Sequence, residues 1–358
     1  MKIVNRIKKI FNKRNATGFA ICMALLPLLA SCGLVREDLE PCPDPQLELR
    51  FVYTYNMERA NAFPSQVDCL TVYFFNEEDK LVKTEFITDR SLLSDEEWRM
   101  RPELEPGKYR VVAYGGMECE NASFYRVGNF PEGSHFTNLR VQMDPNCLTD
   151  PEKFRLHNHY YGSVEFTMDD REDTKVTVPM MRNTNSIQIA LQNEYTNQPI
   201  DHKDFTFEIT DDNNDFNHDN SLNPTGEILY QPWKKENRST FTSADEENAN
   251  EDDIFNIAVA QFTTSRLMIP NKTTKPTSTR LTIKKASDGS TVLSVPLVNY
   301  MMMFKHDNTG AGLDDMDDQE YLDRENTWNF VFFLKDGFWI DTHIIINDWE
   351  VRMNGTDL

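Results

Sequence analysis

The chain has 358 residues, which is enough for two domains that each bury a core of their own. Its 58 acidic and 37 basic residues give a formal net charge of −21 at pH 7. A protein this acidic repels phosphate backbones, and this argues against nucleic-acid binding.

The N-terminal segment, residues 1–31, has the layout of a bacterial signal peptide. Basic residues between Lys2 and Arg14 come first, and a mainly apolar stretch from about Ala16 to Ala30 follows. This stretch is shorter than the roughly 20 apolar residues that cross a hydrocarbon core. It therefore indicates a signal peptide rather than a transmembrane helix.

The signal ends in Leu29-Ala30-Ser31-Cys32, which matches a lipobox position by position. Small residues before Cys32 admit a peptidase, and the Cys32 thiol can accept a diacylglyceryl group. We therefore expect a lipoprotein whose covalent N-acyl and S-diacylglycerol lipid on Cys32 holds it to a membrane, with no other cofactor. An ordinary secretory signal followed by a chance cysteine is the alternative.

Residues 32–46 are predicted to form a tether after the acylated cysteine. Three prolines and several acidic side chains make this segment resistant to compact folding. An acidic cluster so close to the lipid site also resembles the surface-export signals of Bacteroidota lipoproteins. A plain solvated linker explains the same residues nearly as well.

A first set of predicted strands fills residues 47–182. Apolar side chains occupy every odd position from Leu47 to Tyr55, the period of a half-buried strand. Gly115 and Gly116 end a later strand, and Ser94 with Glu97 can cap a short helix over 94–99. The other expected strands cover 70–75, 81–87, 109–114, 139–143, 161–168 and 175–180, and the polar residues 76–79 form a hairpin turn.

A second set of predicted strands fills residues 183–358. The expected strands cover 187–191, 205–209, 266–269, 280–284, 291–296, 328–334 and 339–346, with a short helix over 317–324. The Met301-Met302-Met303 run is expected in a core strand or at its edge. Two sets of about seven short strands predict an all-β fold of two β-sandwiches in series, 47–182 and 183–358.

Two polar stretches in the second half, 211–224 and 243–253, are predicted to be exposed loops. Within the first, residues 211–220 resemble a calcium loop in composition, because Asp211, Asn213 and Asp215 alternate and oxygen ligands suit Ca²⁺. The glycine and terminal glutamate of an EF-hand loop are missing at the required spacing. We therefore favour a solvated loop.

Four cysteines remain after Cys22 is removed and Cys32 is acylated. These possible disulfide cysteines are Cys42, Cys69, Cys119 and Cys147. They allow three pairings, and the sequence does not choose among them. Export permits disulfides, but buried free thiols are an equal alternative.

The sequence lacks the motifs of common catalytic sites. It contains no Gly-x-Ser-x-Gly elbow, no phosphate-binding glycine loop and no His-Glu-x-x-His motif. His157 and His159 could supply two metal ligands, but no third ligand is nearby, so a surface turn is preferred. We expect a protein that is not an enzyme and has no metal site.

Several segments, in this order and spacing, resemble one family. Besides the lipobox and Cys42-Pro43, they are residues 51–57, 62–64, 67–75, 106–116, 321–326 and 347–349. Together they resemble the FimB/Mfa2 family of fimbrial anchor proteins from Bacteroides-like bacteria. The resemblance extends over nearly the whole chain after the signal.

This resemblance implies two tandem transthyretin-like β-sandwich domains in an outer-membrane lipoprotein, surface-exposed at the base of a fimbrium. It implies shaft subunits as partners, which assemble by β-strand addition after an Arg-specific protease opens their groove. The anchor would end subunit assembly and thereby limit the length of the fimbrium. Only Cys32 carries over residue by residue. A tip or accessory adhesin subunit and a surface glycan-binding lipoprotein are the alternatives.

Overall fold

The structure is a computed structural model. It describes residues 45–194, 200–241, 254–271, 275, 278–307, 313, 315–335, 337–347 and 349–352. The predicted signal, Cys32, Cys42 and the acidic loop 243–253 lie outside the described residues. In the part of the chain that is described, no helix combines the length and the apolar character needed to span a bilayer.

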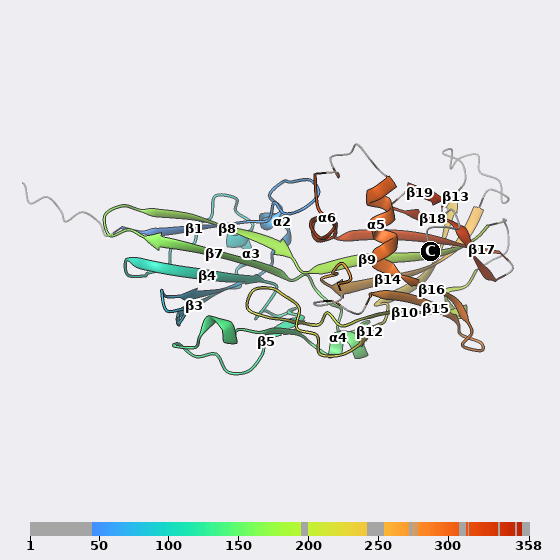
Figure 1. Cartoon of the computed structure of the whole chain (residues 1–358), viewed down its shortest axis with the longest axis horizontal. Coiled ribbons are helices and arrows are strands. Elements are labelled where there is room, and N and C mark those ends of the chain that lie inside the picture. The colour runs from blue at the N-terminus through green and yellow to red at the C-terminus, as the bar shows by residue number, and fades with distance from the viewer. Residues whose placement is uncertain are drawn as a thin grey trace, which may run out of the picture. The chain divides into compact units, whose positions relative to one another are not determined.

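The first sandwich pairs a six-stranded sheet with a three-stranded sheet (Figure 1). In spatial order the larger sheet contains β1 (Leu47–Val52), β8 (Thr174–Arg182), β7 (Tyr160–Met168), β4 (Gly107–Gly115), β2 (Leu70–Phe75) and β3 (Leu81–Ile87). The smaller sheet contains β11 (Asp215–Phe216), β6 (Val141–Met143) and β5 (Phe124–Arg126).

The larger sheet of this sandwich is covered on both faces. Tyr73 and Phe75 of β2 face the small sheet, whereas Val72 and Phe74 face a second core. That second core also contains the alternating apolar residues of β1 and is closed by α2 (Phe63–Gln66) and α3 (Arg90–Leu93). All six residues of β2 are therefore buried, as expected for a strand without a solvent face.

The second sandwich pairs a six-stranded sheet with a four-stranded sheet. The larger sheet contains β13 (Lys234–Phe241), β14 (Ile254–Ser265), β9 (Thr184–Asn193), β17 (Thr327–Lys335), β18 (Phe338–Ile346) and β19 (Trp349–Arg352). The smaller contains β12 (Ile228–Tyr230), β10 (Phe205–Asp211), β15 (Arg280–Lys285) and β16 (Thr291–Pro296).

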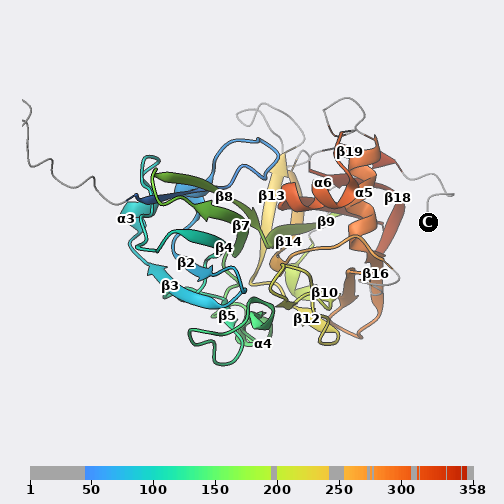
Figure 2. The same ribbon diagram turned by 60° about the vertical axis from the view of Figure 1, so that its left-hand side comes forward.

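Among the residues that the structure describes, helices are few and short, apart from one. The longest is α5 (Leu297–Asp307), which lies beside α6 (Asp318–Arg324) in both views (Figures 1 and 2). The others are η2 (Phe136–Asn138), α4 (Asn146–Thr149) and η3 (His202–Asp204). The predicted helix at 317–324 is confirmed.

The prediction of an all-β chain with two β-sandwiches in series is confirmed. The chain crosses from one large sheet to the other through Asn183 alone, since β8 ends at Arg182 and β9 begins at Thr184. The crossing is not the only link, because β11 pairs with β6 of the first sandwich. One continuous core cluster accordingly includes side chains of both halves.

Three predicted elements are wrong. The helix expected at 94–99 is a single turn over Arg90–Leu93, because the Asp89 side chain accepts from Ser91 N and starts the turn earlier. The strand expected at 266–269 is absent, since β14 ends at Ser265. Met301-Met302-Met303 lies in α5, where Met301 and Met302 face the core.

Gly116 provides a sharp test of the first sandwich. Its φ is +76°, and a Cβ at this position would collide with the carbonyl oxygen of Asn158. We expect Gly116→Ala to lower the free energy of unfolding by about 3 kcal/mol or more, because backbone strain and a backbone clash add. Chemical denaturation of the purified protein measures this loss.

Gly133 supplies the matched control. Its φ is +84°, but nothing lies within 4 Å of its Cβ position. Gly133→Ala should therefore cost only the conformational penalty of about 1 kcal/mol. Equal losses for the two variants would contradict the proposed clash.

Candidate functional site at the junction of the two sandwiches

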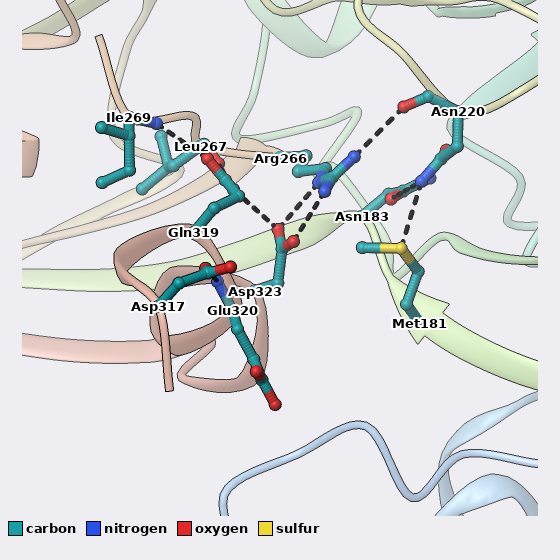
Figure 3. Close-up of polar contacts among 10 residues, drawn as sticks. All are labelled: Met181, Asn183, Asn220, Arg266, Leu267, Ile269, Asp317, Gln319, Glu320 and Asp323. Atoms are coloured by element: carbon teal, nitrogen blue, oxygen red, sulfur yellow. Dashed lines mark hydrogen bonds and ion pairs between the residues drawn. The ribbon is translucent and has the colours of Figure 1, made fainter. Parts of the chain in front are cut away.

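The junction begins with two buried asparagines. Asn183, between β8 and β9, donates from Nδ2 to Oδ1 of Asn220 at 2.7 Å, and Asn220 Nδ2 donates back to Asn183 Oδ1 at 3.0 Å (Figure 3). The backbone N–H of Asn183 donates to the carbonyl of His159 at 2.7 Å. This pairing matters because an unsatisfied buried amide costs about 1–3 kcal/mol.

A bidentate ion pair forms the next part of the junction (Figure 3). Arg266 Nε and Nη2 contact the two carboxylate oxygens of Asp323 at 2.7 and 2.6 Å, and Nη1 donates to the carbonyl of Asn220 at 3.1 Å. Gln319 Nε2 donates to the same carboxylate at 3.0 Å. These bonds hold α6 against the segment that follows β14.

The end of α6 also holds the segment that follows β1. The Arg324 guanidinium lies 4.2 Å from the centre of the Tyr55 ring, which is a cation–π contact. Asn326 Nδ2 donates to the Tyr53 hydroxyl at 2.8 Å, and Arg182 Nη1 donates to Asn326 Oδ1 at 3.0 Å. The 321–326 segment noted in the sequence therefore connects the two sandwiches.

His159 is fully buried beside this junction. Its ring stacks on Phe124 at 4.3 Å and on Tyr114 at 5.6 Å. Burial lowers the pKa of His159 from 6.5 to about 3. His157 is exposed, so the structure does not bring the two imidazoles together, and the surface turn expected here holds only for His157.

The prediction of an exposed loop at 211–224 is wrong for its first six residues, which are buried. Asp215 is fully buried and is paired with Arg140 through Nη2 at 2.6 Å. The Tyr230 hydroxyl donates to Asn213 at 2.7 Å, and Lys275 contacts both Asp211 and Asp212. Protein donors thus occupy the oxygens that a calcium loop would use.

The four cysteines differ in their bonding. Cys69 and Cys119 form a disulfide. Cys147 is a free, buried thiol whose pKa is raised to about 11 by burial. Cys42 lies outside the described residues, so its part in a disulfide stays a prediction.

An open cleft of about 680 Å³ lies beside this disulfide. Asp68, Arg90 and His157 from the first sandwich line it, together with Ser186 and Thr263 from the second. Its walls are mainly polar, so it could hold a polar ligand group. Among the described residues, no group of three His, Cys, Asp or Glu side chains is placed to bind a metal ion.

The outer strands differ in how their free backbone edges are protected. β1 is closed at Leu49, whose N–H and carbonyl both bond to Met100. β13 is lined by charged side chains, including the Lys234–Glu236 pair at 2.6 Å. β3 is covered at Leu81 by residues 133–134, but beyond Val82 no backbone bond to its outer edge occurs within the described residues. An open strand edge invites pairing with another chain.

One family model covers most of the chain. The model of the fimbrillin-A associated anchor proteins Mfa1 and Mfa2 matches residues 39–355. Among solved structures, a "putative adhesin" from Bacteroides thetaiotaomicron is 41% identical, with a TM-score of 0.79, over 88% of this chain and 100% of that one. A search of curated proteins found no match.

Two further structures are similar at lower identity. "Putative polysaccharide binding proteins" from Bacteroides thetaiotaomicron are represented by a chain 25% identical, with a TM-score of 0.70, over 88% of this chain and 100% of that one. The fimbrial anchor protein Mfa2 from Porphyromonas gingivalis is 13% identical, with a TM-score of 0.59, over 87% of this chain and 100% of that one. At this identity the last likeness concerns the fold.

The buried His159 predicts a pH dependence of stability. Between about pH 6.5 and 3 the unfolded chain binds a proton at this residue that the folded chain does not, so stability falls as the pH falls. We expect His159→Phe to remove that part of the slope, which approaches about 1.4 kcal/mol per pH unit. Chemical denaturation at pH 7, 5 and 4 measures it.

His157→Phe is the control, because this side chain is exposed and two residues away. Burial and the neighbouring Arg155 also lower the pKa of His157, so His157→Phe should remove part of the slope too, but a smaller part than His159→Phe removes. If His159→Phe runs parallel to the unchanged protein over this pH range, burial of a neutral imidazole is refuted.

Proposed function

This chain belongs to the family of fimbrillin-A associated anchor proteins Mfa1 and Mfa2, and from this membership we propose that it anchors a fimbrium through a lipid on Cys32. Membership makes it a fimbrium-associated protein of the cell surface, in a family of structural proteins rather than enzymes. The lipobox supports the further step that a lipid on Cys32 attaches the protein to a membrane, and family membership supports the outer membrane.

One structural observation carries the anchoring proposal. β1, the first described strand after the tether, pairs in parallel with β8 over six residues, from Leu47 with Thr174 to Val52 with Pro179. β8 continues through Asn183 into β9, which is an inner strand of the second sandwich. A force that pulls on the tether therefore acts along β1 and loads all the backbone hydrogen bonds between β1 and β8 at once, in shear. The force then passes from β8 through Asn183 into β9 of the second sandwich.

Anchoring requires the lipid, so Cys32→Ala is the direct test. We expect this variant to lose incorporation of labelled palmitate and to leave the outer-membrane fraction, because the acyl chains supply the attachment. Metabolic labelling followed by cell fractionation and immunoblotting measures both. Fimbriae should then be shed into the medium.

Cys22→Ala is the matched control, because Cys22 lies in the signal upstream of the lipobox. It should keep both the label and the membrane location. Continued labelling of Cys32→Ala would refute lipid attachment at this residue. If deletion of the whole gene leaves fimbriae attached and unchanged in length, the anchor role is refuted and a tip adhesin is favoured instead.

We further propose that the anchor ends subunit assembly by receiving a shaft subunit through β-strand addition. The support is the outer edge of β3 beyond Val82, which carries no backbone partner among the described residues. In strand addition, main-chain bonds give affinity and side-chain contacts give register. Phe86, with 57% of its surface exposed, lies on this edge and offers such a contact.

Proline substitutions can test the edge without removing a buried side chain. Thr84 and Glu85 are adjacent in β3, so the N–H of one faces β2 and that of the other faces outward. We compare Thr84→Pro with Glu85→Pro. The substitution at the residue whose N–H faces outward should leave the melting temperature of the protein unchanged, but this variant should no longer capture shaft subunits from fimbriated cells.

Thr291→Pro is the control, since Thr291 is the exposed first residue of β16, an edge strand of the second sandwich. This variant should retain capture. Undiminished capture by both β3 variants would show that the shaft subunit joins elsewhere.

A further inference from the structure

The described residues contain one lysine that is almost completely removed from solvent, and it faces two carboxylates. Lys275 is 1% exposed, and its Nζ contacts Oδ1 of Asp211 and Oδ1 of Asp212. The side chains of the two aspartates are 0% and 7% exposed. From this buried arrangement of one amine and two carboxyl groups, we infer that Lys275 forms an intramolecular amide bond with Asp212. This inference does not depend on the anchoring proposal.

The backbone holds the three side chains together from separate segments. Asp211 is the last residue of β10, and Lys275 precedes β15, which pairs with β10. The backbone of Lys275 is held in place by Asn271, because the Lys275 N–H and carbonyl both bond to that residue, at 3.0 and 2.8 Å. Reacting groups held in contact in this way reach very high effective concentrations, roughly 10⁵ M or more.

Burial disfavours an excess of negative charge at this site. A buried site with one ammonium and two carboxylates would carry a net negative charge, which is costly away from water. Burial raises the pKa of Asp211, so this carboxyl group holds a proton more readily than one in water. A neutral amine beside a carboxylic acid is the pair that can condense.

The Asp211 carboxyl group is placed to transfer protons during the reaction, and Cγ of Asp212 is the atom that the amine attacks. The Thr279 hydroxyl donates to Asp211 Oδ2 at 2.6 Å, and the N–H of Asp212 donates to Asp211 Oδ1 at 2.8 Å, so Asp211 is firmly held. Its carboxyl group also touches the attacking nitrogen. It can therefore give a proton to the departing oxygen and accept one from nitrogen.

The reaction is balanced without any other reagent. The lone pair of Lys275 Nζ attacks Cγ of Asp212, a C–N bond forms, and a C–O bond breaks. The departing hydroxyl of the Asp212 carboxylic acid takes the one proton that nitrogen loses and leaves as water, while Asp211 relays this proton and ends in its starting protonation state. Nothing is oxidised or reduced. The product replaces an ion pair with an uncharged amide and closes a loop between residues 63 apart in the sequence.

A tryptic digest of the purified full-length protein, reduced beforehand, tests the amide directly. Cleavage after Lys203 and Lys234 releases residues 204–234, and cleavage after Lys272 and Arg280 releases residues 273–280. We expect these two peptides to be recovered joined, with a mass one water below their sum. Fragmentation should place the joint between Lys275 and Asp212. Recovery of the two peptides separately, at full mass, overturns the proposal and leaves a buried ion pair.

Variants separate the roles and control for adventitious cross-links. Lys275→Arg keeps the positive charge but should abolish the joined peptide, and Asp211→Ala should slow its formation by roughly a hundredfold or more. Lys305→Arg is the matched control, because Lys305 is also buried but binds Met316 O and the half-exposed Asp318, each at 2.7 Å. It should leave the joined peptide unchanged. Persistence of the joint in Lys275→Arg, or a joint at Asp211, refutes the assignment.

Discussion

A single residue carries the chain from one sandwich to the other, and the rest of the structure depends on how its polar groups are satisfied. Asn183 has no room to reach water, yet its amide must find partners. Asn220 supplies both of them, and Asn220 itself adopts a left-handed backbone conformation with φ +65°. The hydrogen bonds to Asn183 therefore hold the loop that carries Asn220 in place.

The remaining junction contacts build outward from this pair. Arg266 binds the carbonyl of Asn220 and the carboxylate of Asp323 at once, so it connects the crossing to α6. A buried ion pair adds little net stability by itself, because desolvation offsets the attraction. The contribution of the Arg266–Asp323 pair is geometric, because a bidentate pair requires one relative orientation of the guanidinium and the carboxylate. This orientation places the 321–326 segment against the end of β1.

The sequence predicted most strands because their signal is local. Alternating apolar residues in β1 and β17 bury one face wherever the strand lies in the molecule. β13 was missed because its sequence, Lys-Lys-Glu-Asn-Arg-Ser-Thr-Phe, is that of a charged edge strand with no apolar period. The helix at Leu297–Asp307 was missed because a run of methionines suits a core strand and a core helix equally well.

The candidate site was much less predictable, since its partners are distant in the sequence. Asp215 and Arg140 are 75 residues apart, and Arg266 and Asp323 are 57 apart. Composition alone therefore indicated a solvated acidic loop where the structure has buried, paired carboxylates. Family resemblance identified the 321–326 segment as notable, but its role in joining the sandwiches depends on contacts with Tyr53, Tyr55 and Arg182 that no local pattern reveals.

The short strand β11 has a consequence for the order in which the protein can fold. Phe216 completes the small sheet of the first sandwich and lies in its core beside Phe124, yet it follows the crossing by more than 30 residues. A chain that has emerged only as far as Arg182 lacks this side chain and leaves part of the core open to water. The first sandwich therefore cannot finish folding until part of the second has been translocated. In an exported protein built in this way, the first core stays incomplete until the chain as far as Phe216 has arrived.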